Sequence, residues 1–262
     1  MHGAIEIENV GMIYHNLNGM RHQALKDINL SIKHQETFGS IGHNGAGKTT
    51  LIKILTGLCH PSTGSCKING ISSKDYHCRE KIGFLQESPE FCYQMKVSEE
   101  LNFHLKLYGI SPGEHKQQLA RLLEEFHLLT VQNRWIHELS KGMRQRLALV
   151  RAFIHDPKII ILDEPMAGLD PQGRYLVRQK LEQYHQQEKS IFLSSHILAD
   201  LEQICDRVAL LAYGKLLEVG KPEEMLANSG AKSNSSDFLT SSASPGDNRP
   251  KTLEQYYLEK MS

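Results

Sequence analysis

The chain contains 262 residues, of which 40% are hydrophobic and 23% charged, and its 30 basic residues balance its 30 acidic residues to a formal net charge of zero. This composition is typical of a soluble globular protein of one or two domains, and it argues against a surface built as a whole for nucleic acid. We find no run of 18 apolar residues and no signal-peptide pattern, so we expect neither a membrane span nor secretion.

The five cysteines are an odd number and include no CxxC pair, which favours reduced thiols in a cytosolic protein.

The first part of the chain, residues 1 to about 41, has the pattern of strands. Apolar residues alternate with polar ones around Ile5 and Ile7 and again around Leu30, and a short apolar run over 37–41 stops at a glycine. Residues 42–87 follow with a Gly-rich loop, a helix predicted over 48–58 and short β segments over 66–71.

Residues 88–157 change to helical periodicity. Two apolar stripes with helical spacing occur there, one formed by Leu119, Leu122, Leu123 and Phe126, the other by Met143, Leu147, Val150 and Ile154. Ser98 and Ser140 are the predicted N-caps of helices in this part of the chain.

Residues 158–220 alternate between strands (158–162 and 190–194) and helices (173–187 and 197–205), followed by a hairpin through Tyr213 and Gly214. Strands that alternate with helices of this length predict a mostly parallel sheet with crossover helices. Residues 228–250, rich in Ser, Asn, Gly and Pro, are predicted to be a flexible linker, and 251–262 a short C-terminal helix.

The loop after the strand at 37–41 matches the full pattern GxxxxGK[ST]. It consists of Gly42, His43, Asn44, Gly45, Ala46, Gly47, Lys48 and Thr49, followed by Thr50. Glycines let successive N–H groups point at phosphate oxygens, and the following helix N-terminus favours an anion. We expect Lys48 to neutralise the terminal phosphates of a nucleotide and the Thr49 hydroxyl to coordinate Mg²⁺.

An acid pair, Asp163 and Glu164, follows the apolar run over 159–162. Ligands of open α/β sheets bind at the carboxyl ends of parallel strands, so both carboxylates are candidates for the same site. We expect Asp163 to hold Mg²⁺, and Glu164 to polarise the attacking water as a general base.

Three further segments resemble ATP-binding cassette (ABC) ATPases. Residues 139–143 read LSKGM, which is similar to that family's LSGGQ signature; 166–170 are similar to its D-loop; and His196, after the strand at 190–194, looks like its switch histidine. The resemblance covers about residues 4–225. It implies a P-loop NTPase with a mostly parallel core sheet, an N-terminal antiparallel β subdomain and an inserted α-helical subdomain over 88–157, the whole ATPase domain being residues 1–227.

The resemblance also implies roles for single residues. Ser140 and Gly142 would grip the γ-phosphate of ATP held by the opposite protomer, and Asp170 would lie across that interface. His196 would position the attacking water with Glu164. Tyr14 aligns with the aromatic residue that stacks on adenine.

The glutamine that contacts the γ-phosphate and Mg²⁺ in the family falls in this chain at Gln86 or Glu87. The spacing from Ile82 favours Glu87, whose carboxylate suits a hard cation such as Mg²⁺. Which of the two residues takes the role is left open by the sequence.

The implied function is an ATP-hydrolysing transporter subunit that dimerises around ATP and drives a separate membrane permease, most simply in an exporter. Such a protein would be cytoplasmic and peripheral on the inner face of the membrane, with no specific nucleic acid as partner. Within residues 90–95, Phe91, Tyr93 and Met95 could contact a permease or belong to the core. The alternatives are a soluble ABC protein that acts on ribosomes or DNA, and a nucleotide-gated regulatory subunit.

Overall fold

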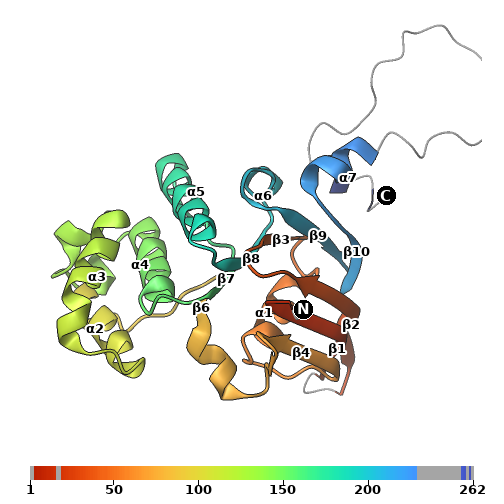
Figure 1. Cartoon of the computed structure of the whole chain (residues 1–262), viewed down its shortest axis with the longest axis horizontal. Coiled ribbons are helices and arrows are strands. Elements are labelled where there is room, and N and C mark those ends of the chain that lie inside the picture. Colours follow the sequence, from red (N-terminus) through yellow and green to blue (C-terminus); the bar gives the residue numbers. More distant parts are fainter. Residues whose placement is uncertain (1–2, 16–18, 229–254, 258–259, 261–262) are drawn as a thin grey trace, which may run out of the picture.

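The computed structural model describes residues 3–15, 19–228, 255–257 and 260, which form two β-sheets and a group of helices (Figure 1). The strands are β1 (Ile5–His15), β2 (Arg21–Ile32), β3 (Thr37–Ile41), β4 (Thr63–Ile68), β5 (Ile71–Ser72), β6 (Ile82–Leu85), β7 (Ile159–Asp163), β8 (Ser190–Ser195), β9 (Arg207–Ala212) and β10 (Lys215–Gly220). The α-helices are α1 (Lys48–Leu55), α2 (Val97–Leu107), α3 (Pro112–Glu125), α4 (Lys141–Phe153), α5 (Pro171–Gln186), α6 (Leu198–Ile204) and α7 (Pro222–Asn228). Short 3₁₀ helices occur at η1 (Tyr76–Lys81), η2 (Leu129–Val131) and η3 (Ile136–Glu138).

The core sheet has the strand order β10-β9-β3-β8-β7-β6. Its five strands from β9 to β6 pair in parallel, and β10 joins β9 by the predicted hairpin. All five residues of β3 and of β7 are buried, as expected of parallel strands covered on both faces. In β7, Ile159 and Ile161 pack into one apolar cluster, while Ile160 and Leu162 pack into the other. The predicted mostly parallel sheet is confirmed.

The N-terminal sheet is antiparallel, with the order β2-β1-β4-β5. Helix α1 contributes Leu51, Ile52, Ile54 and Leu55 to the cluster that also contains buried residues of both sheets. This packing between the two sheets holds the start of α1 against the carboxyl ends of the core strands.

Helices α2, α3 and α4 lie together at the end of the molecule opposite β1, β2 and β4 (Figure 1). Both predicted apolar stripes face inward, and Leu122, Leu123 and Phe126 are at most 1% exposed. The Ser140 hydroxyl accepts a hydrogen bond from the N–H of Met143 (3.2 Å), so the predicted cap of α4 is confirmed.

Two predicted helix boundaries are wrong. Helix α2 begins at Val97, before Ser98, because the Glu99 carboxylate accepts from the N–H of Lys96 (2.8 Å) and makes Lys96 the N-cap, two residues before the predicted one. Helix α1 ends at Leu55, three residues before the predicted end. There the N–H groups of residues 57 and 58 turn back to the carbonyls of residues 54 and 53, which terminates the helix.

The C-terminal segment packs against the cassette through two tyrosines. Residues 255–257 and 260 are helical, and Tyr256 and Tyr257 are 3% and 8% exposed. The Tyr256 hydroxyl donates to Glu218 Oε2 (2.7 Å), and the Tyr257 hydroxyl accepts from the N–H of His43 in the glycine-rich loop (3.0 Å). Of the predicted linker over 228–250, Asn228 ends α7 and the rest lies outside the described residues, as does the remainder of 251–262.

Candidate functional site

The glycine-rich loop joins a central strand of the core sheet to a helix. Strand β3 ends at Ile41 and α1 begins at Lys48, so the loop lies at the carboxyl end of β3. Gly47 has φ +112°, and a Cβ there would lie 2.7 Å from Leu25 Cδ2 and 2.8 Å from the carbonyl oxygen of Ala24. Only glycine fits this close approach to β2. The loop is thereby held around the N-terminus of α1, where unpaired N–H groups attract anions.

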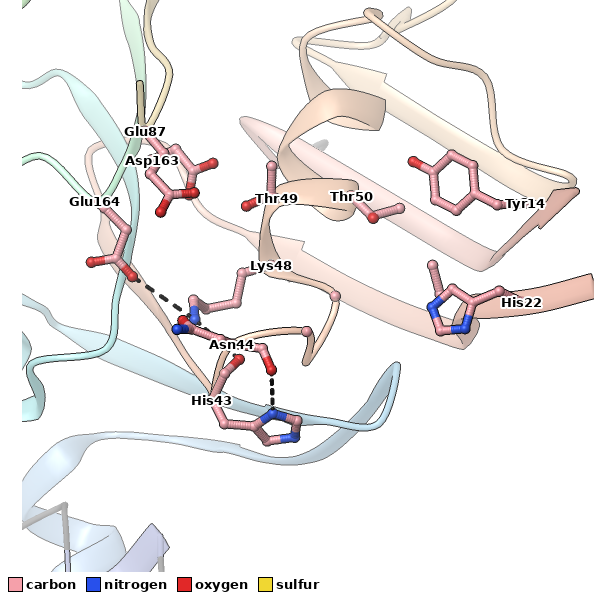
Figure 2. Close-up of a pocket in the computed structure, with 13 residues that line it drawn as sticks. Tyr14, His22, His43, Asn44, Lys48, Thr49, Thr50, Glu87, Asp163 and Glu164 are labelled. Atoms are coloured by element: carbon pink, nitrogen blue, oxygen red, sulfur yellow. Dashed lines mark hydrogen bonds and ion pairs between the residues drawn. The ribbon is translucent and has the colours of Figure 1, made fainter. Parts of the chain in front are cut away.

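A cleft of about 380 Å³ opens beside the loop, within the size range of ligand sites. It brings together most of the residues predicted for the site (Figure 2), and it is lined by Tyr14, His22, Ala24, His43, Asn44, Gly45, Gly47, Lys48, Thr49, Thr50, Glu87, Asp163 and Glu164. Gly42 and Ala46 belong to the same loop but do not line the cleft.

Lys48 is 7% exposed and is the amine at the centre of this cleft. Its Nζ donates to the carbonyl oxygen of Gly42 (2.5 Å) and lies 3.8 Å from Glu164 Oε1. Burial lowers the pKa of Lys48, although the carboxylates of Glu164, Asp163 and Glu87 act in the opposite direction. The Lys48 ammonium group, which lies among these carboxylates, is placed to form ion pairs with the oxygens of an anionic ligand that enters the cleft.

The two predicted acids stand at the end of β7, and Asp163 and Glu164 are 2% and 6% exposed. Glu164 Oε2 lies 2.7 Å from Nδ1 of His196, whose side chain is 54% exposed. Asp163 Oδ1 accepts a hydrogen bond from the Ser194 hydroxyl (2.6 Å), and the same hydroxyl accepts from the N–H of Glu164 (3.1 Å). The structure therefore brings the acid pair and the histidine together, as the sequence predicts.

The two candidates for the glutamine position point in different directions. Glu87 lines the cleft next to Asp163 and faces Thr49 in Figure 2. The Gln86 amide instead donates to the carbonyl oxygen of Ser88 (2.6 Å). Oxygen atoms of Thr49, Asp163 and Glu87 thus share one wall of the cleft.

Ser140, Gly142 and Asp170 do not line this cleft. Ser140 caps α4, and Asp170 caps α5 by accepting from the N–H of Gly173 (2.9 Å). A Cβ on Gly142 would lie 3.7–3.8 Å from Leu169 and Gly168, so the signature segment packs against the segment that ends in Asp170. Within one copy of the chain, these residues and the cleft form separate groups.

Two polar residues around the cleft, His22 and Ser194, were not predicted, nor was Ala24, which also lines it. His22 lines it and is the β-register partner of Tyr14, which is 37% exposed. Ser194, fully buried, contacts both acids. A serine directly after the apolar run Ile191–Leu193, two residues before the histidine, is the sequence signal that could have pointed to Ser194.

Comparisons with known proteins point to one family. The family model described as ABC transporter matches residues 25–167. An uncharacterized ABC transporter ATP-binding protein of Synechocystis sp. is 40% identical over 208 residues, 79% of this chain and 59% of the relative. The Nod factor export ATP-binding protein I of Burkholderia orbicola is 34% identical over 201 residues, 76% of this chain and 66% of the relative. The chain thus spans less than two thirds of the length of these curated relatives.

A solved dimeric structure of the ATP-binding cassette MJ0796, in a post-hydrolysis state bound to ADP and Pi, is similar over 83% of this chain and 98% of its own, with 26% identity and a TM-score of 0.77. In the part of the chain that the structure describes, no helix has both the length and the apolar character needed to cross a membrane. The family match, the relatives and the shared fold lead to one conclusion: the chain belongs to the ABC transporter family, among its ATP-binding cassettes.

Proposed function

We propose that the cleft binds ATP and that the chain, paired with a second copy, hydrolyses it to drive a separate membrane permease. The observation that carries this proposal is the convergence of Lys48, Asp163 and Glu164 in one cleft at the glycine-rich loop. A buried amine, backbone N–H groups and carboxylates at the ends of parallel strands are the parts that phosphoryl transfer from a nucleotide requires.

The loop and Lys48 bind the phosphates. The N–H groups around the start of α1 take the phosphate oxygens, and Lys48 leaves the Gly42 carbonyl to pair with the terminal phosphate. The exposed ring of Tyr14, at the far end of the cleft, stacks on the base, with His22 beside it.

The oxygen donors of Thr49, Asp163 and Glu87 fit a hard divalent cation, since hydroxyl and carboxylate oxygens are the ligands that Mg²⁺ prefers. Bound there, Mg²⁺ would neutralise charge that develops on the phosphates.

Glu164 receives a proton from the attacking water. Its carboxylate is 8% exposed and is oriented by Nδ1 of His196 on one oxygen, with Lys48 Nζ near the other. Because Glu164 is almost excluded from solvent and held by His196, its orientation toward a bound water is fixed before the reaction.

A second copy completes the site. Ser140 begins α4, and a helix N-terminus favours an anion, yet in one chain it does not line the cleft. Head-to-tail pairing lets Ser140 and Gly142 of one copy contact the γ-phosphate held by the other, with Asp170 across the interface. The dimeric cassette reported above supports this arrangement.

The export direction is inferred from the similarity to the Nod factor export ATP-binding protein, and the separate permease from membership of the ABC transporter family. The segment after Glu87 and the helical region are the proposed contact surface. Tyr93 is 43% exposed there, whereas Phe91 is 9% exposed under the Arg151 guanidinium. A permease contact of this kind holds the protein at the inner face of the cell membrane.

The test is Glu164→Gln. Turnover falls by about 100-fold or more, since a general base contributes about 10²–10⁴-fold, while ATP affinity is retained and a dimer accumulates in ATP. Glu182→Gln, which makes the same change at an exposed position of α5, is the control. Turnover in Glu164→Gln equal to wild type would contradict the base assignment. A wild-type protein that binds ATP without hydrolysing it would favour the nucleotide-gated regulatory subunit.

The partner is tested by co-purification. Recovery of a multi-span membrane protein supports the permease partner, and recovery of ribosomes without such a protein contradicts it.

A further inference from the structure

Ser194 is a buried polar residue in the middle of the core sheet. It lies in β8, between β3 and β7, and is 0% exposed. Its register partner on β7 is Asp163, so the two side chains leave neighbouring strands side by side. The three residues before it, Ile191–Phe192–Leu193, are apolar, and a hydroxyl that is itself fully buried needs a specific partner.

The hydroxyl of Ser194 contacts both acids of the site. It donates to Asp163 Oδ1 (2.6 Å) and accepts from the N–H of Glu164 (3.1 Å). A hydroxyl has one hydrogen to donate, so that hydrogen is committed to Asp163. The carboxylate therefore keeps one oxygen occupied inside the protein and turns the other toward the cleft that it lines.

The backbone of Glu164 needs support of this kind. Its φ is +50°, a left-handed conformation that a non-glycine residue rarely adopts. The hydrogen bond from the Glu164 N–H to Ser194 is one of the contacts that hold this residue. The Gln145 amide also lies near the acid pair and donates to the carbonyl oxygen of Pro165 (3.1 Å).

We propose that Ser194 is a positioning residue that sets both acids through a single hydroxyl. It orients the Asp163 carboxylate for the cation and fixes the backbone from which Glu164 reaches the water. Two residues further along the chain, His196 holds the Glu164 carboxylate itself. The end of β8 thus controls the placement of both acids, an inference that rests on the proposed roles of Asp163 and Glu164.

The test compares Ser194→Ala with a matched control on the same strand. Ser190 is 4% exposed, and its hydroxyl accepts from the backbone N–H of Gln35 (2.9 Å) at the end of β8 away from the cleft. Ser190→Ala therefore removes one partly buried hydrogen bond of the same strand without touching the acids. The measurements are the rate of ATP hydrolysis, its dependence on Mg²⁺ concentration, ATP binding in EDTA, and thermal unfolding.

We expect Ser194→Ala to lower kcat by about 10- to 100-fold and to raise the Mg²⁺ concentration for half-maximal rate, as removal of an outer partner of a metal ligand does. ATP binding in EDTA stays within about twofold of wild type, because Asp163 then holds no cation. Ser194→Thr, which keeps the hydroxyl, recovers most of the turnover. Ser190→Ala changes stability alone.

The inference is overturned if Ser194→Ala keeps wild-type turnover and Mg²⁺ dependence, or if Ser190→Ala reproduces its kinetic effect. Loss of folding in Ser194→Ala but not in Ser190→Ala also overturns it, since the hydroxyl would then serve stability. Asp163→Asn distinguishes a failure of the Ser194 proposal from a failure of the proposed function. Unchanged turnover in Asp163→Asn refutes the proposed function itself. If Asp163→Asn is inactive while Ser194→Ala is fully active, only the role of Ser194 fails.

Discussion

The guanidinium of Arg151 joins the signature helix to the segment that follows Glu87. On α4, Arg151 Nη1 lies 3.1 Å from Oε1 of Glu100 and donates to the carbonyl oxygen of Glu90 (2.9 Å), with the guanidinium 4.7 Å from the ring centroid of Phe91. Glu100 is 4% exposed, and His104 Nε2 lies 3.3 Å from the same Oε1. Replacing Arg151 by Met keeps an apolar stem of similar length and removes the charge.

We expect Arg151→Met to lower the free energy of unfolding by about 3 kcal/mol at pH 7.5. Breaking a buried ion pair costs about 3–5 kcal/mol because a charge remains buried without its partner, and His104 keeps the loss at the lower end. For a chain of this size the midpoint of thermal unfolding would fall by roughly 6–12 °C.

The pH dependence gives a second criterion. Burial raises the pKa of Glu100, but His104 and Arg151 outweigh burial, and the pKa of this carboxyl is held below its usual value. Its contribution to stability is therefore present above the unfolded-state pKa and is lost as the pH falls through the folded-state pKa. Arg151→Met removes two of the interactions that lower this pKa, so the pKa of Glu100 rises, and the difference between variant and wild type shrinks as the carboxyl becomes protonated.

Urea unfolding at pH 7.5 and 5, followed by circular dichroism, measures both effects. Adding Glu100→Gln to Arg151→Met should recover a large part of the loss, because no buried charge then remains. Arg121→Met is the control: Arg121 pairs with Glu125 on the surface of α3, and such a pair contributes at most about 1 kcal/mol. An Arg151→Met protein as stable as wild type, or one further weakened by Glu100→Gln, would refute this reasoning.

Two further predictions concern stability. Gly64 has φ +78°, and a Cβ there would lie 2.3 Å from the carbonyl oxygen of Asn9; Gly64→Ala should therefore cost about 2–4 kcal/mol in urea unfolding. Gly70→Ala, at φ +76° with open space around it, should cost about 1 kcal/mol, and equal losses would contradict the steric argument. Burial lowers the pKa of His155 from 6.5 to about 4, despite its hydrogen bond to the carbonyl of Ile82. Between pH 6.5 and about 4 the unfolded chain binds a proton that the folded chain does not, so the free energy of unfolding falls as the pH drops through this window. His155→Gln should reduce this pH dependence in urea unfolding. An unchanged pH dependence would show that other groups cause it.

The parts of the site that the sequence predicted consist of residues that are consecutive in the chain. The glycine-rich loop needs a strand before it and a helix after it, and the acids 163 and 164 need a buried strand, so local patterns suffice. Ser194 was not predicted because its role depends on the register of β8 against β7. This register brings Ser194 into contact with Asp163, 31 positions away in the sequence. His22 escaped for the same reason, as a cross-strand partner of Tyr14.

The fold was predictable to a similar degree. The alternation of strands with helices over 158–220 predicted the parallel sheet, and the stripe containing Leu122 predicted the face of α3. Helix ends were less predictable, because Ser98 competes with the closure formed by Glu99. The spacing from Ile82 favoured Glu87 over Gln86, and in the structure Glu87 lines the cleft beside the glycine-rich loop.

The contact between Tyr257 and His43 has a consequence for synthesis of the chain. The N–H of His43 emerges from the ribosome early, but the hydroxyl that accepts its hydrogen bond is added 214 residues later. Until then the backbone N–H of His43 must donate its hydrogen bond to water or to another part of the chain. A polypeptide that stops before Tyr257 would therefore never form this hydrogen bond to the glycine-rich loop.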